Sequence, residues 1–160
     1  MSLTTRNADC IRLARVEEAV LLSDLCFRSK AVWGYDEPFM TLCREALSID
    51  PLQIASGDVW VAMAANGGIA GVVELAAADE PGTLDLGKLF VEPRHIRSGF
   101  GHVLLAHAVA EARRRGAKRL SILADPNAAR FYEQNGAAKI GDAPSDAIPG
   151  RFVPLYEIAL

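Results

Sequence analysis

The sequence predicts one α/β domain of the α+β kind, with a mixed and mostly antiparallel sheet flanked by helices. Residues 58–65 and 69–78 resemble two strands, and the Asn-Gly-Gly at 66–68 between them accepts the positive φ of a tight hairpin turn. Apolar residues recur at helical spacing over 104–112. The length of 160 residues, 51% of them hydrophobic, suits a single domain with its own core.

The elements before this helix follow from local patterns. Residues 11–15 alternate apolar and basic residues as a short strand does, and residues 17–30 show helical periodicity. A break with Gly and Pro precedes a second predicted helix at 37–47. Residues 84–91 add a third strand to the hairpin and end before Pro93, which has no amide hydrogen to donate to a ladder.

The C-terminal part continues with two helices and three strands. The helix that starts after Gly101 ends at Gly116, with three arginines in its last turn that complement the helix dipole. A strand, a short helix and a final pair of strands are predicted at 119–124, 126–135, 137–140 and 151–160. The predicted order is therefore β-α-α-β-β-β-α-β-α-β-β.

Composition excludes several functional classes. The net charge is −3, and the only basic run, Arg113–Arg115, is three residues long, which argues against a nucleic-acid surface. The longest apolar run, 59–65, is far shorter than the ~18 residues of a membrane span. Residues 1–16 lack the layout of a secretory signal, so we expect a cytoplasmic protein.

The cysteines and histidines predict neither a disulfide framework nor a metal site. The cysteines are odd in number, widely spaced and without a CxxC pair, and no Cys/His cluster has zinc spacing. These residues are Cys10, Cys26, Cys43, His95, His102 and His107.

Two glycine patterns match nucleotide-binding motifs only in part. Residues 82–88 match the start of a P-loop, but Leu89 stands where a hydroxyl must reach magnesium. Residues 99–104 begin like a dinucleotide fingerprint, but Leu104 replaces the third glycine and the preceding strand belongs to an antiparallel meander. A P-loop or a Rossmann domain is therefore not expected.

The turn from the strand ending at Val91 into the helix after Gly99-x-Gly101 has two readings. The first amide groups of a helix have no intrahelical partner and lie at the positive end of its dipole, so they can bind a phosphate, and glycine lets that phosphate approach. The other reading is a plain turn that needs glycine for its φ angle. The spacing alone favours neither.

Two segments resemble the motifs of the GNAT acetyltransferase superfamily. Residues 89–105, LFVEPRHIRSGFGHVLL, look like its coenzyme A motif, and residues 125–137, DPNAARFYEQNGA, are similar to its second signature, a short helix with a tyrosine that ends at glycine. The predicted element order also resembles the whole GNAT fold. Ile96 departs from the pattern, because many members have Gln or Arg there, and Arg97 follows one position later.

The resemblance implies that acetyl-CoA is the cosubstrate and that no metal takes part. Amide groups of residues 97–102 would bind the pyrophosphate, while the strand at Phe90 and Val91 would pair with the pantetheine arm at a bulge that Gly87 could ease. Asn127 would face the same arm, or would only begin the helix. The implied cofactor-binding residues are Phe90, Val91, Arg97, Ser98, Gly99, Phe100, Gly101, His102 and Asn127.

Acyl transfer from a thioester to an amine needs a base, because an alkyl amine with a pKa near ~10.4 is almost fully protonated at pH 7. The resemblance implies Asp85, at the position where some family members place a strand carboxylate, and Glu74 on the neighbouring predicted strand is the other candidate. Either could simply face solvent. Tyr132 matches the family's general acid for the departing sulfur, or is a core aromatic. The resemblance also implies that the amide group of Val91 meets the oxyanion.

The acceptor in this superfamily approaches over the first two helices and the last hairpin. The candidate substrate-binding residues are Trp33, Tyr35, Asp36 and Arg151. Aromatic faces beside carboxylates suit a cationic amine, whereas Arg151 could instead face a substrate carboxylate. We therefore expect an N-acetyltransferase for a small-molecule or peptide amine, acting in a ternary complex. The alternative is a coenzyme A sensor or scaffold without activity. Dimers are common in this superfamily, and the strand at 152–160 could contribute to one.

Overall fold

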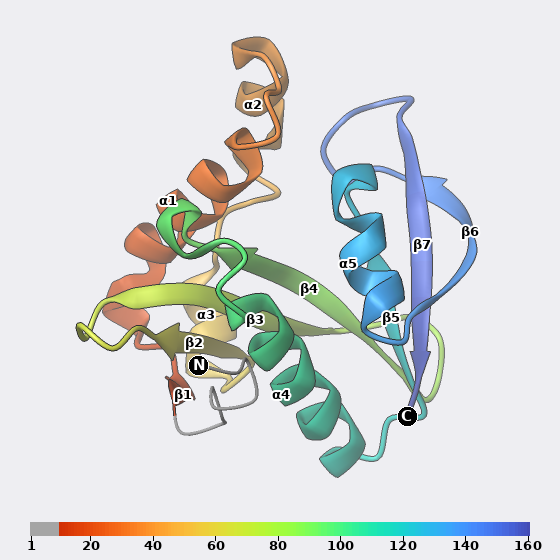
Figure 1. Ribbon diagram of the computed structural model, residues 1–160. Helices are drawn as coiled ribbons and strands as arrows, with labels where there is room; N and C mark the ends of the chain where they lie inside the picture. The colour runs from red at the N-terminus through yellow and green to blue at the C-terminus, as the bar shows by residue number, and fades with distance from the viewer. Residues whose placement is uncertain (1–9) are drawn as a thin grey trace.

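The computed structural model describes residues 10–160, which form one α/β domain (Figure 1). The expectation that no secretory signal occurs in residues 1–16 falls partly on residues 1–9, which lie outside the described residues. Among residues 10–160 no helix is long and apolar enough to cross a membrane.

Seven strands form one sheet in the order β1-β2-β3-β4-β5-β7-β6. All neighbouring pairs are antiparallel except β4 and β5, which are parallel. This arrangement confirms the predicted mixed, mostly antiparallel sheet. The strands are β1 (Ile11–Leu13), β2 (Val59–Met63), β3 (Ile69–Ala77), β4 (Thr83–Val91), β5 (Arg119–Leu123), β6 (Ala138–Pro144) and β7 (Phe152–Ala159).

Helices cover both faces of the sheet. The α-helices are α1 (Ala19–Ala31), α2 (Glu37–Cys43), α3 (Pro51–Ala55), α4 (Phe100–Arg114) and α5 (Ala129–Gln134). Short 3-10 turns, η3 (Val16–Glu18), η4 (Pro93–His95) and η5 (Pro126–Ala128), precede α1, α4 and α5.

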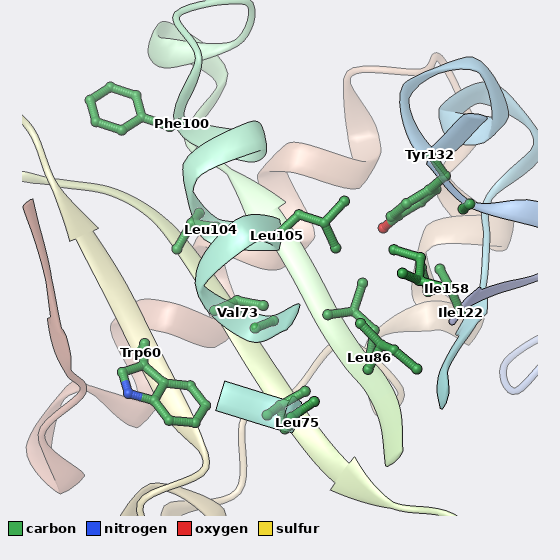
Figure 2. Packing of buried hydrophobic residues seen from close by; sticks show 14 of the residues in the cluster. Trp60, Val73, Leu75, Leu86, Phe100, Leu104, Leu105, Ile122, Tyr132 and Ile158 are labelled. Atoms are coloured by element: carbon green, nitrogen blue, oxygen red, sulfur yellow. The ribbon is translucent and has the colours of Figure 1, made fainter. Parts of the chain in front are cut away.

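Alternating side chains of the sheet supply two hydrophobic cores. On one face α4 and α5 pack on Trp60, Val73 and Leu86, and Figure 2 shows Leu104 and Leu105 of α4 over these strands. On the other face α1, α2 and the segment after them pack on residues such as Val59, Val61 and Val72. Because successive residues of β2 serve opposite faces, β2 reads as a continuous apolar run.

The sheet opens between β4 and β5. These strands pair only from Thr83–Asp85 to Arg119–Ser121, at the start of both strands. Beyond this point β4 continues to Val91 without a neighbour on that side, and Figure 1 shows the two strands separating from their common end at the lower right. The sheet therefore has a V-shaped gap.

A bulge in the β3–β4 ladder marks the position where β4 turns away. Glu74 pairs with Lys88, but the next residue, Leu75, pairs with Leu86, so Gly87 is the extra residue. A Cβ on Gly87 would lie 2.5 Å from Oε1 of Glu74. A side chain at this position would therefore have to displace the Glu74 carboxylate, which occupies that space.

Some predicted boundaries were wrong. The second helix ends at Cys43 rather than at Leu47, and α3 was not predicted, although Asp50 caps it by accepting a hydrogen bond from the Leu52 amide at 2.9 Å. Strand β6 extends to Pro144, into the segment expected to be a loop. In α3 the helix cap at Asp50, and in β6 the pairing with β7, determine the structure more than the local sequence pattern does.

The C-terminal strand is not an edge of the sheet. Strand β7 pairs with β5 on one side and with β6 on the other, so its backbone has no free side for another copy of the chain. Among residues 10–160, the outermost strands of the sheet are β1 and β6. A homodimer stays a prediction, and pairing through the backbone of residues 152–159 is not a route to it.

Candidate functional site

The connection from β4 to α4 adopts left-handed conformations at two positions. Arg97 has a φ of 67° and Gly99 a φ of 88°. Gly99 is the N-cap of α4, and its carbonyl accepts the first hydrogen bond of the helix from the Val103 amide at 3.2 Å. The amide groups of Gly101 and His102 in the first turn of α4 consequently lie at the positive end of a 15-residue helix, before the first bond of its ladder. This end of α4 has the geometry of an anion-binding site.

A groove with a cavity of about 610 Å³ runs from this helix end along β4 to α5. Its walls include the strand end, the left-handed connection, the first turn of α4 and one side of α5. Six of the predicted cofactor-binding residues line it, namely Phe90, Val91, Arg97, Gly99, Gly101 and His102, together with Trp33, Phe131 and Tyr132.

The other three predicted cofactor-binding residues do not line the groove. The Ser98 amide donates a hydrogen bond to the His95 carbonyl at 3.2 Å. The side chain of Phe100 is buried in the core, at 1% exposure. Asn127 donates its side-chain amide to Tyr35 at 3.1 Å and to Asp125 at 3.0 Å. The geometry therefore favours Gly101 and His102 over Ser98 for contact with an anion.

The free edge of β4 borders the groove. The Glu92 amide donates to the Ala70 carbonyl on β3 at 2.8 Å, and Gly71 pairs with Val91. Because backbone groups of successive strand residues point to opposite edges, the amide and carbonyl groups of Val91 and of Leu89 point away from β3 into the gap. An extended ligand in the gap can thus form hydrogen bonds as an added strand does.

Tyr132 lies where α5 faces the gap. Its side chain is largely buried, lines the groove and packs with Phe131 and Tyr156. Figure 2 shows it among the core side chains of the α4 face. Burial raises the pKa of the phenol, and the charge of Asp125 raises it further. Tyr132 therefore stays protonated at neutral pH and can donate a hydrogen bond.

A second cavity, of about 790 Å³, lies on the other side of the bulge. Its floor is formed by β3, β4 and β5. Its walls are formed by the end of α2 with the turn after it, and by the end of β6 with the segment after it. Glu74, Asp85, Gly87, Lys88 and Ser121 are among the floor residues. The wall contributes Leu42, Glu45, Ala46, Pro144, Asp146 and Ala147.

Glu74 is the most buried acidic side chain of this cavity. Its side chain is 6% exposed, Oε1 lies 3.4 Å from Nζ of Lys88, and Oε2 has no hydrogen-bond partner among the described residues. Burial raises the pKa of Glu74, and the nearby Lys88 ammonium offsets only part of that effect. The carboxylate is therefore a stronger base than an exposed glutamate.

Asp85 also faces the cavity but stands at the closed end of the gap, where β4 still pairs with Ser121 of β5. Its pKa is raised by burial first, and then by the negative charges of Asp146 and Asp79. Both predicted bases thus line one cavity, and Glu74 lies closer along β4 to the free edge at Leu89.

The predicted substrate-binding residues lie elsewhere. Tyr35 donates a hydrogen bond to Asp125 at 2.9 Å and accepts one from Arg151 at 3.0 Å. The Asp125 carboxylate also binds the Lys30 ammonium at 2.9 Å. Asp36 caps α2 by accepting from the Phe39 amide at 2.9 Å, and the half-exposed Trp33 lines the groove.

Tyr35, Asp36 and Arg151 therefore hold structural elements together. The hydrogen bonds join the loop before α2, the start of η5 and the segment before β7. None of the four residues Trp33, Tyr35, Asp36 and Arg151 lines the cavity that holds Glu74. Their contact with a substrate stays a prediction.

Comparison with known proteins decides the family. The sequence model described as the acetyltransferase (GNAT) family matches residues 25–137, which is most of the chain. The protein belongs to the acetyltransferase (GNAT) family. No curated protein matched its sequence.

Solved structures share the GNAT fold at low identity. A GCN5-related N-acetyltransferase from Rhodopseudomonas palustris has a TM-score of 0.74 and 22% identity, with 94% of each chain covered. The PaiA N-acetyltransferase of Thermoplasma acidophilum, crystallised with coenzyme A, has a TM-score of 0.74 and 19% identity, covering 94% of this chain and 98% of that one. The N-acetylglutamate synthase of Neisseria gonorrhoeae, complexed with coenzyme A and N-acetyl-glutamate, has a TM-score of 0.66 and 21% identity, covering 94% of this chain but 34% of that one.

The GNAT scaffold brings together residues that the sequence did not single out. Glu45, Lys88 and Asp146 line the same cavity as Glu74, although they come from the turn after α2, from β4 and from the β6–β7 segment. The pairing of Glu74 with Lys88 was readable only once the register was known. Within residues 10–160 no group of three or more His, Cys, Asp or Glu side chains is placed to bind a metal ion.

Proposed function

We propose that the protein is an acetyl-CoA-dependent N-acetyltransferase, which transfers an acetyl group to the primary amine of a small molecule or peptide in a ternary complex. The proposal rests on one observation, which is that three features suited to acetyl transfer lie next to one another in the structure. The amide-rich start of α4, the free edge of β4 at Val91 and the cavity with Glu74 follow one another along β4.

The groove fits coenzyme A by its chemistry. The positive end of α4, with the amide groups of Gly101 and His102, suits a pyrophosphate. The backbone groups of Leu89 and Val91 suit the amides of a pantetheine arm, and Phe90 lines the same path. Asn127 acts as a positioning residue that holds Tyr35 and Asp125. The bound thioester supplies an activated acetyl group.

Glu74 is the proposed base. It lies beside the open part of the gap, and its raised pKa matches the task of accepting a proton from an ammonium ion better than an ordinary carboxylate would. Asp85 lines the same cavity from the closed end, which makes it the second choice. The amide of Val91, which points into the gap, is available to the oxygen that becomes negative during transfer.

Tyr132 is proposed to donate a hydrogen bond to the departing sulfur. A thiol has a pKa near ~8.5, well below that of the buried phenol, so complete proton transfer from Tyr132 is unfavourable. Stabilisation of the thiolate by a hydrogen bond needs no such transfer.

We expect Tyr132→Phe to lower kcat by about 10 to 100-fold at pH 7, toward the low end of acid–base contributions. The phenylalanine keeps the packing against Phe131 and Tyr156, so the melting temperature should change little. Steady-state thiol release at saturating substrates measures the effect. An unchanged kcat would remove the tyrosine from the mechanism.

The proposed function is tested with two measurements on the whole chain. Acetyl-CoA should raise the melting temperature in a concentration-dependent way, whereas ATP and NAD should not. An amine panel should then give acetyl-CoA-dependent thiol release together with an acetylated product in mass spectra. Absence of acetyl-CoA binding contradicts the proposal, and binding without transfer to any amine points to the coenzyme A sensor instead.

A further inference from the structure

The cavity that holds Glu74 carries a surplus of negative charge. Four carboxylates line it, against a single ammonium group, so the formal excess is three negative charges. The three carboxylates other than Glu74 form no ion pair among the described residues. The charged residues are Glu45, Glu74, Asp85, Asp146 and Lys88.

A second observation indicates that a polar ligand completes this cavity. The Glu74 side chain is more than nine-tenths buried, and its Oε2 has no hydrogen-bond partner in the described part of the chain. A buried oxygen of this kind is unfavourable unless a donor reaches it. Lys88 is already placed at Oε1, at 3.4 Å. A ligand that donates a hydrogen bond to Oε2 would remove this cost.

The cavity offers nothing to a negatively charged ligand group. Lys88, the only cation that lines it among residues 10–160, faces Glu74. Arg151 does not line the cavity, and its guanidinium is bound to the Tyr35 hydroxyl. An acceptor with a carboxylate, such as an amino acid, would meet repulsion without compensation.

The charge surplus also favours an acceptor with two amino groups over an acceptor with only one. The nitrogen that attacks the thioester must be uncharged at that moment, so it cannot neutralise the carboxylates around it. A second ammonium group on the same molecule stays charged and can do so. Asp85 pairs with Ala76, two residues from Glu74, so the two residues share a face of the sheet and their backbone positions have the diagonal spacing of roughly 7–8 Å. This spacing is comparable to the nitrogen–nitrogen span of 1,4-diaminobutane.

We propose that the acceptor is an aliphatic diamine or polyamine, with one amino group beside Glu74 and the next held by Asp85, Asp146 and Glu45. This inference rests on the proposed function and names its substrate class. In the transfer, the new bond forms between the amine nitrogen and the acetyl carbon while the carbon–sulfur bond breaks. The amine proton passes to Glu74, and the sulfur leaves with the electron pair as a thiolate.

The test compares acceptors of matched length. With acetyl-CoA saturating, kcat/KM should be at least ~10-fold higher for 1,4-diaminobutane than for 1-aminobutane, and lowest for 4-aminobutanoate, which carries a carboxylate at the second end. Asp146→Asn should raise KM for 1,4-diaminobutane several-fold and leave KM for 1-aminobutane unchanged. Asp24→Asn, the same change on an exposed residue of α1 outside both cavities, should alter neither.

The outcomes separate this inference from the proposed function. Calorimetry with acetyl-CoA is run on the same protein. If acetyl-CoA binds but 1-aminobutane is acetylated as well as 1,4-diaminobutane or better, only the diamine inference is overturned. The same holds if Asp146→Asn changes KM equally for both acceptors. Absence of acetyl-CoA binding, or of transfer to every amine, overturns the proposed function and the inference with it.

Discussion

Glu74→Gln is expected to lower kcat by roughly 10² to 10⁴-fold, the range of a lost general base. Glutamine keeps the size of the side chain and its place opposite Lys88 but cannot accept the proton of an ammonium ion. Thiol release in the steady state, at saturating acetyl-CoA and amine, measures the loss. Asp85→Asn should cost less, because Asp85 stands where β4 and β5 are still paired. A larger loss in Asp85→Asn than in Glu74→Gln would show that the base is Asp85.

The pH dependence gives an independent readout of the same residue. The base works only when deprotonated, so kcat should rise with pH through the pKa of Glu74, which burial raises above its ordinary value near 4.5. In Glu74→Gln this acidic limb should be absent, and the remaining activity should follow the deprotonation of the amine alone. A limb that persists unchanged in the variant would contradict the assignment.

The stability of Glu74→Gln should not fall together with its activity. Since the pKa of Glu74 is higher in the folded protein than in the unfolded chain, protonation of this group favours folding at low pH, and the contribution is lost as pH rises through the folded pKa. At pH 7 the wild type therefore carries the cost of a buried charge that glutamine removes. The melting temperature of Glu74→Gln should consequently not fall, whereas a misfolded variant would lose both stability and activity.

The parts of the fold that the sequence predicted are those with local causes. The hairpin at Asn66 forms because Gly67 adopts a φ of 87° and the Asn66 side chain accepts a hydrogen bond from the Gly68 amide at 2.9 Å. Helix α4 ends before Gly116, which has a φ of 85°. Each signal lies within a few residues of its effect, so it survives whatever packs around it.

The features that escaped prediction depend on contacts between distant segments. Glu45 and Asp146 are separated by about a hundred residues, and only the closure of α2 and the β6–β7 segment over the sheet places both at one cavity. Tyr35 and Arg151 have the composition of a substrate pocket, yet the fold joins them to each other. The residue types indicated that these side chains form polar contacts. The sequence could not show that each contact is made with another residue of the chain and not with a substrate.

The gap between β4 and β5 illustrates how far a family resemblance reaches. The motif at residues 89–105 implied a bulge that Gly87 could ease, and the register shift beside Glu74 confirms this bulge. The resemblance did not indicate that the Glu74 carboxylate fills the space next to Gly87, because that contact depends on this chain's own side chains. The bulge and the gap in the sheet were predictable from the resemblance, whereas the side-chain contacts beside them were not.

Gly99→Val is expected to raise the dissociation constant of acetyl-CoA by about 100-fold or more. The residue has a φ of 88°, where a β-branched side chain is strongly disfavoured, so the connection must change shape and carry the first amide groups of α4 with it. Hydrogen bonds to charged groups contribute about 1.5–3 kcal/mol each, and the loss of two would account for a change of this size. Calorimetric titration with coenzyme A and with acetyl-CoA measures it.

Gly116→Val is the matched control, because it imposes the same strain at the opposite end of the same helix. Gly116 has a φ of 85°, and a Cβ there would meet no atom within 4 Å. Both variants should lose a similar amount of stability, about 1–2 kcal/mol, but only Gly99→Val should lose affinity. Since both substitutions strain the backbone alike, a difference in affinity can come only from the place where the strain acts. Equal affinities of the two variants for acetyl-CoA would show that the start of α4 does not bind the phosphates. Weakened binding in Gly99→Val alone would locate the phosphates at that helix end.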